Sequence, residues 1–205
     1  MAQIAHALDN GICVAAWTFD ELYGRDGKFL DGVASLGQIF VGEIPSNFRG
    51  WVRPPEVVEP KPRKQGKTKG KRRRSRLKPR VAARCRRSQV RHLLKYSPVF
   101  RQQSWQRYRI KDTDKGPEVW EVKWSVFWRK AGGGLPTRRH CLIVARNVLT
   151  GEVKYFLANR VPGEWNPFSG QYITLRWLLR VAFGRWSIES CFRQAKEELG
   201  MDHYE

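Results

Sequence analysis

Residues 12–20 read Ile-Cys-Val-Ala-Ala-Trp-Thr-Phe-Asp, and this short stretch decides the fold class. Its residues are almost all apolar, and it is bounded by Asn10-Gly11 before and by Asp20 after. A short, nearly continuous apolar run with such boundaries is typical of a strand that is buried on both faces. The sequence therefore predicts a buried strand that ends at Asp20.

The segments around this strand predict an α/β layered sheet. Residues 2–10 have the pattern of a helix that closes at Asn10-Gly11, and residues 27–35 predict a second helix that Gly37 ends. Residues 39–44 predict another buried strand, which Pro45 stops. Helices and strands that alternate with short connections are typical of an α/β domain.

The rest of the chain divides into three further parts. After the core segment 1–50 comes a proline-rich and basic insertion, 51–104, with a helix expected over 81–96. The part 105–160 is β-rich, and its alternation predicts two successive hairpins that form a small antiparallel sheet inserted in the α/β body. These hairpins are expected to use strands at 106–111, 119–129, 140–147 and 152–157. The C-terminal part, 161–205, predicts helices over 172–183 and 186–199.

Positive charge is concentrated in one segment. The 205-residue chain has 39 Lys and Arg against 19 Asp and Glu, a net charge of +20. Residues 60–111 hold 21 of the basic residues and no acidic one, so the remainder has 18 basic and 19 acidic residues. Such a segment attracts nucleic-acid phosphates by releasing their counterions, and Lys71, Arg72, Arg73 and Arg74 form its densest run. A solvated linker or a targeting tail would show the same composition.

Other features argue against several classes of protein. No apolar run is long enough to span a bilayer, and the first ten residues lack the pattern of a signal peptide. The four cysteines show no paired spacing, which favours a reduced, cytoplasmic protein. The histidines show no ligand spacing, so a zinc site is not expected. Trp120, Trp124 and Trp128 fall on one face of a strand, where they would either stack on an unpaired base or, more simply, fill a core.

Two acidic residues are candidates for chemistry. Asp20 follows a buried strand, where α/β sheets present catalytic groups, although a helix N-cap needs no other function. Glu189 lies in the last predicted helix, on one side with Arg185, Arg193 and Lys196. An ordinary amphipathic helix with Glu–Arg pairs would show the same arrangement.

The motifs around these acids resemble those of a known family. The spacing Arg185-x3-Glu189-x6-Lys196 resembles the Tyr-x2-Arg-x3-Glu-x6-Lys signature of bacterial insertion-sequence transposases of the DDE superfamily. The block from Asp20 to Asp26, Asp-Glu-Leu-Tyr-Gly-Arg-Asp, resembles the block that holds that family's second acidic ligand. The hairpins between the two blocks match the β-rich insertion of these transposases.

The resemblance implies a fold, a reaction and a metal. It implies a partial RNase H-like domain, with Asp20 and Glu189 as two members of an Asp-Asp-Glu triad that holds two Mg²⁺ ions. Arg185 and Lys196 would contact phosphate near the scissile bond, and Arg193 lies on the same side of the helix. The partner would be double-stranded DNA, at transposon ends and target sites, and whether the chain forms a homodimer stays open.

This chain departs from the family pattern in two places. Ala182 occupies the position of the signature's tyrosine. The family's first aspartate belongs on a strand upstream of Asp20, yet the only acid among the 19 preceding residues is Asp9, in a predicted helix. We therefore expect the first ligand to be missing, the chain to be an internal fragment, and the isolated chain to bind DNA with little cleavage.

Two other functions remain open at this stage. A non-catalytic protein could bind nucleic acid through residues 60–111 alone, and then Asp20 and Glu189 would not matter. Another RNase H-like nuclease could act on RNA–DNA hybrids, although the long β-rich insertion and the Arg–Glu–Lys spacing argue against it. A shared fold does not define a function, so the interpretation as a transposase rests on the two motif blocks.

Overall fold

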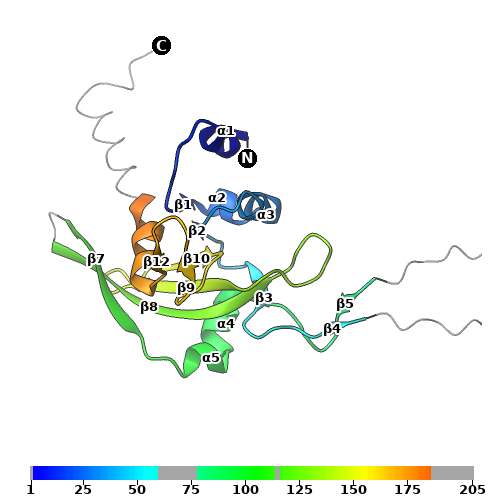
Figure 1. Cartoon of the computed structure of the whole chain (residues 1–205). Helices are drawn as coiled ribbons and strands as arrows, with labels where there is room; N and C mark the ends of the chain where they lie inside the picture. Colours follow the sequence, from blue (N-terminus) through cyan, green and yellow to red (C-terminus); the bar gives the residue numbers. More distant parts are fainter. Residues whose placement is uncertain (1, 60–77, 114–115, 186–205) are drawn as a thin grey trace, which may run out of the picture.

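The computed structural model of the chain describes residues 2–59, 78–113 and 116–185 (Figure 1). Its centre is a mixed sheet with the strand order β1-β2-β10-β9-β8-β3-β6, and β7 pairs with β8 beside that path. The strands of this sheet are β1 (Trp17–Phe19), β2 (Phe40–Glu43), β3 (Arg49–Trp51), β6 (Ser88–Gln89), β7 (Gln106–Thr113), β8 (Gly116–Arg129), β9 (His140–Asn147) and β10 (Val153–Ala158). This mixed α/β architecture agrees with the partial RNase H-like domain that the resemblance implies.

The first two strands form the only parallel pair in the described sheet. Trp17 lies opposite Phe40 and Phe19 opposite Gly42, and α2 (Glu21–Gly24) and α3 (Gly27–Ser35) connect β1 to β2. Among the described residues, β1 pairs only with β2, so it is the last strand at this end of the sheet. The apolar run from residue 12 is therefore a strand only from Trp17, whose N–H donates to the carbonyl of Ile39.

The two predicted hairpins are continuous with this α/β part. β7 pairs with β8 and β9 with β10, as the alternation predicts. β10 then pairs with β2 in antiparallel register, with Leu157 opposite Gly42. The hairpins therefore extend the sheet of β1 and β2 edge to edge instead of forming a second sheet.

Helices cover both faces of the sheet, and each face has its own core. On one face, the helix formed by residues 175–185 buries Leu178, Leu179 and Phe183 against Val41 and Trp120. On the other face, α3, α4 (Val90–Tyr96) and α5 (Pro98–Arg101) bury Leu30, Val90 and Phe100. Both faces of the central strands are thus shielded from water, which is why these strands are apolar at nearly every position.

The remaining elements are small and peripheral. The helix α1 (Ala2–Asp9) has no fully buried residue. Two further two-stranded pairs join β4 (Val57–Val58) to β5 (Arg80–Val81), and β11 (Trp165–Asn166) to β12 (Gln171–Tyr172). The β4–β5 pair extends away from the body of the molecule in Figure 1.

Two predicted helices begin later than expected. The segment 81–96 contains β6 before α4, so its helix covers only Val90–Tyr96. The helix predicted from residue 172 begins at 175, because Thr174 caps it by accepting the N–H of Trp177 at 3.1 Å. The helix predicted over 186–199 lies outside the described residues.

Candidate functional site

Asp20 lies at the carboxyl end of β1 and begins α2. Its backbone is extended, with φ −79° and ψ 179°, and one carboxylate oxygen accepts the N–H of Tyr23 at 3.2 Å. Asp20 is therefore a helix N-cap, the simpler of the two roles that the sequence allows. The cap uses one of the two carboxylate oxygens, and the side chain is 38% exposed, so this role leaves the carboxylate accessible to a ligand.

A glycine allows α2 to lie directly on the neighbouring strand. A Cβ at Gly24 would fall 1.8 Å from the carbonyl oxygen of Glu43, a distance that no side chain tolerates. Only glycine permits this approach, which fixes α2, and with it Asp20, against the end of β2.

Glu43 is a second carboxylate at the same edge of the sheet. Phe19 pairs with Gly42 in parallel register. The residues that follow them, Asp20 and Glu43, therefore lie side by side. Side chains alternate along strands, and Phe19 and Phe40 pack in the core under α3. Asp20 and Glu43 therefore belong to the opposite face, which the helix 175–185 covers.

Cations accompany both carboxylates. The guanidinium of Arg185 lies 3.9 Å from a carboxylate oxygen of Asp20, and the ammonium group of Lys154 lies 3.3 Å from one of Glu43. Arg185 is the last described residue of the helix 175–185. The structure thus brings together Asp20 and Arg185, two residues from opposite ends of the chain that the resemblance assigns to one site.

The other predicted site residues lie outside the described part of the chain. These are Glu189, Arg193 and Lys196 in the C-terminal signature, and the basic run Lys71, Arg72, Arg73 and Arg74. Within the described residues there is no group of three or more His, Cys, Asp and Glu side chains that could hold a metal ion. Ala182, at the position of the signature's tyrosine, is 5% exposed and belongs to the core under its helix.

Sequence reasoning did not find Glu43 or Lys154. Both look like ordinary surface charges in the sequence, and only the register of β2 against β1 and β10 places them at the site. Glu43 lacked the signal that selected Asp20, because it lies inside the predicted strand 39–44 and not after its end.

A second polar cluster lies around Trp105, on the face that carries α4 and α5. The ammonium group of Lys123 and the guanidinium of Arg146 lie 4.8 Å and 4.5 Å from the centre of the Trp105 ring. Arg146 and Arg107 both pair with Glu121, and their hydrogen bonds lower the pKa of that carboxyl group. Burial lowers the pKa of Lys123, whose ammonium group donates to the carbonyl of Phe100 at 2.7 Å.

The tryptophans of β8 divide between the core and its margin. Trp120 is completely buried, and its ring centre lies 4.9 Å from that of Phe183. Trp120 therefore fills the core, while Trp124 and Trp128 are half-buried.

The fold and the strand-end cluster define an α/β domain that presents carboxylates at the carboxyl ends of two parallel strands, the usual position of a functional site in such sheets. A family model described as DDE superfamily endonuclease matches residues 1–117, more than half of the chain, and the chain belongs to this family. The matched residues include Asp20 and Glu43, whereas Arg185 and the signature after it lie beyond the match. A comparison with curated proteins found none that matches this chain.

No helix in residues 2–59, 78–113 and 116–185 is long and apolar enough to cross a membrane.

Proposed function

We propose that this chain carries part of the catalytic domain of an insertion-sequence transposase, which cleaves DNA and transfers the cut strand. One observation carries the proposal: Arg185, four residues before Glu189 in the signature, lies 3.9 Å from Asp20. The first residue of the C-terminal signature therefore lies beside the carboxylate of the Asp20 block, which supports a shared site. Membership of an endonuclease family makes DNA the substrate.

The residues present suit a hard divalent cation such as Mg²⁺. Asp20 supplies a partly exposed carboxylate, Glu43 lies at the same sheet edge, and oxygen ligands are those that Mg²⁺ prefers. In this proposal Asp20 and Glu189 hold the metal, which would supply positive charge for the attacking and leaving oxygens at phosphorus. Arg185 and Lys196 would hold the DNA phosphate in line for the displacement, and Arg193 would contact DNA on the same side.

The DNA would extend from this site onto the basic surfaces of the chain. Lys71, Arg72, Arg73 and Arg74 would bind phosphates along the duplex. The cluster around Trp105 offers the Arg146 guanidinium beside a half-buried aromatic ring, a combination that nucleic-acid contacts use. Because such binding releases counterions, affinity should fall steeply as salt increases.

Substitutions at Asp20 can separate its metal-binding role from its capping role. Asparagine caps a helix about as well as aspartate, so Asp20→Asn keeps the start of α2 and removes the charge. Asp26→Asn is the matched control, because Asp26 also caps a helix, accepting the N–H of Lys28 at 2.8 Å, and lies outside the proposed site. Titration calorimetry with Mn²⁺ should show binding to the parent chain and to Asp26→Asn, and clear weakening in Asp20→Asn and Glu189→Gln. Equal binding by all four proteins would refute the proposed metal site.

We also propose that the isolated chain cleaves DNA poorly. Asp20 caps α2 and faces a cation, which is how a structural carboxylate is arranged. Incubation of supercoiled plasmid with Mg²⁺ or Mn²⁺ should therefore give little nicking by this chain alone. Strong nicking that Glu189→Gln abolishes would contradict this expectation.

The alternative function is binding of nucleic acid without catalysis. The Trp105 cluster favours it, because a DNA contact made by Arg146 and Trp105 would need neither acid. Replacing Lys71, Arg72, Arg73 and Arg74 with glutamine distinguishes the two. If binding is the only function, this variant should lose all activity in cells, and Asp20→Asn should lose none.

A further inference from the structure

A cavity lined by described residues lies at the edge of the sheet opposite Asp20. It has a volume of about 730 Å³, and its walls come from the end of α3, from the loop between β8 and β9, and from the segment after β10. Gly37 and Gln38, just before β2, line it, whereas Asp20 lies beside Glu43, where β2 ends. The cavity is therefore separated from the proposed metal site by the length of β2.

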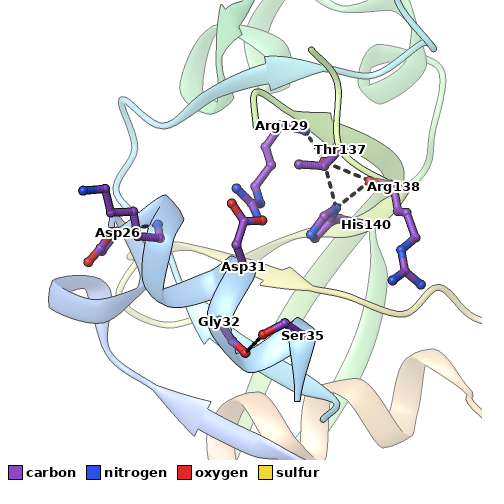
Figure 2. Close-up of polar contacts among 9 residues, drawn as sticks. Asp26, Asp31, Gly32, Ser35, Arg129, Thr137, Arg138 and His140 are labelled. Atoms are coloured by element: carbon purple, nitrogen blue, oxygen red, sulfur yellow. Dashed lines mark hydrogen bonds and ion pairs between the residues drawn. The ribbon is translucent and has the colours of Figure 1, made fainter. Parts of the chain in front are cut away.

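A buried arginine forms part of the cavity wall. Arg129 is 3% exposed, and its guanidinium forms an ion pair with Asp31 of α3 (Figure 2). Its Nε is buried and has no hydrogen-bond partner among the described residues. A buried charged donor without an acceptor is costly, and Asp31 is the only carboxylate of the described residues that pairs with Arg129.

Three more arginines line the cavity with Arg129. Arg139 pairs with Glu164 at 2.9 Å. Arg138 and Arg160, within the described part of the chain, form neither a side-chain hydrogen bond nor an ion pair with another residue. Against these four arginines stand two carboxylates, Asp31 and Glu164, so the cavity has an excess of two positive charges.

The loop that carries Arg138 is held in place by polar contacts. The backbone N–H of Arg129 donates to the Thr137 hydroxyl at 3.2 Å, and that hydroxyl donates to the carbonyl of Arg138 at 2.9 Å. The Nδ1 atom of His140 lies 2.8 Å from the same carbonyl (Figure 2). Burial, reinforced by the charge of Arg129, lowers the pKa of His140 to about 4, so the ring is neutral near pH 7. The backbone of Arg138 is thus held in place beside that of Arg129.

We propose that this cavity binds the phosphate group of a nucleotide-sized ligand, with Arg138 and Arg160 as its donors and the charge of Arg129 in the wall behind them. Guanidinium groups match the oxygens of phosphate in geometry and charge, which favours phosphate over a neutral ligand. The volume is in the range of about 300–1,000 Å³ of small-molecule sites. Trp128, half-buried in the same wall, offers a surface for the sugar or base.

The phosphate could belong to a free nucleotide or to a DNA strand, and the test separates these sources. Calorimetry on the full chain would compare three probes: a deoxynucleoside monophosphate, a 5′-phosphorylated dinucleotide, and the same dinucleotide without its terminal phosphate. Binding of the monophosphate identifies a terminal phosphate as the ligand. Binding of both dinucleotides but not of the monophosphate identifies the strand backbone. Either result supports the site, and binding of none of the probes overturns it.

Matched double variants test the position of the site. Arg138→Ala/Arg160→Ala removes two charges from the cavity, and neither side chain is fully buried, so the fold should survive. Arg53→Ala/Arg101→Ala removes two charges from exposed positions that do not line the cavity. A charge-assisted hydrogen bond contributes about 1.5–3 kcal/mol, so the cavity variant should bind at least about tenfold more weakly. The control should retain nearly all of its affinity.

Two results would count against the proposal. Equal weakening in both double variants would show that the binding follows net charge and not this cavity. Loss of nucleotide binding in Asp20→Asn would place the ligand at the metal site instead. Since that variant tests the proposed metal site separately, the two proposals can fail independently.

Discussion

The contact between Gly42 and Phe19 gives a sharp test of how the strand that carries Asp20 is held. A Cβ at Gly42 would lie 1.9 Å from a ring carbon of Phe19, and the ring is 8% exposed. Gly42→Ala must therefore displace the ring or the strand. Such overpacking costs about 1–3 kcal/mol, and the smaller freedom of the unfolded chain returns about 0.4–1 kcal/mol.

The net effect of Gly42→Ala should be a loss of about 1–2 kcal/mol in the free energy of unfolding. The free energy of unfolding of such a chain falls by about 2 kcal/mol for each molar of urea, so the midpoint of urea unfolding should fall by about 0.5–1 M. The melting temperature should fall by about 2–8 °C for a chain of this size. Because Phe19 directly precedes Asp20, the affinity for Mn²⁺ should fall as well.

A matched glycine provides the control for this substitution. Gly184 lies in the helix 175–185, and a Cβ there would meet nothing within 4 Å. Gly184→Ala should raise the urea midpoint, because alanine favours helix by up to about 1 kcal/mol. Adding Phe19→Leu to Gly42→Ala should recover part of the loss, with a coupling of about 1 kcal/mol in the double-mutant cycle. Parent-like stability of Gly42→Ala would refute this account of the strand packing.

Two further predictions concern buried titratable groups. The pKa of His140 is lowered from 6.5 to about 4, so the unfolded chain takes up the proton first as the pH falls. Its contribution to stability is full above about pH 6.5 and is lost towards pH 4, by up to about 3 kcal/mol, and urea unfolding of His140→Gln should show a shallower decline. Burial raises the pKa of the Cys141 thiol, while Cys13 is exposed. Peptide mapping after brief alkylation in the native state should therefore find Cys13 modified and Cys141 intact, and rapid labelling of Cys141 would mean that β9 is accessible.

Local signals in the sequence predicted much of the fold. The helix over 27–35 was predicted with its observed bounds, because Asp26 caps its start and Gly37 follows its end. The strand 140–147 was also predicted with its observed bounds, since its apolar run is sharply delimited. The prediction of a strand from residue 12 was wrong for its first five residues, because pairing with β2 begins only at Trp17.

Long-range pairing explains what sequence reasoning missed. The antiparallel register of β10 on β2 joins the hairpins to the α/β part, and no local pattern records such a pairing. For the candidate site, Asp20 was accessible to prediction as the residue that ends a buried run. Glu43 and Lys154 were not, because their proximity depends on that same register.

This pairing also determines the order in which the domain can fold. The hairpins β7–β8 and β9–β10 join neighbours in sequence, so their contacts close short loops and can form quickly. The β2–β10 ladder joins segments at opposite ends of the domain and must close a long loop, which slows it. During synthesis, β1 and β2 leave the ribosome first and can pair with each other, but β2 has no partner in the rest of the sheet until β10 is complete. The strand pair that carries the candidate carboxylates therefore joins the sheet last.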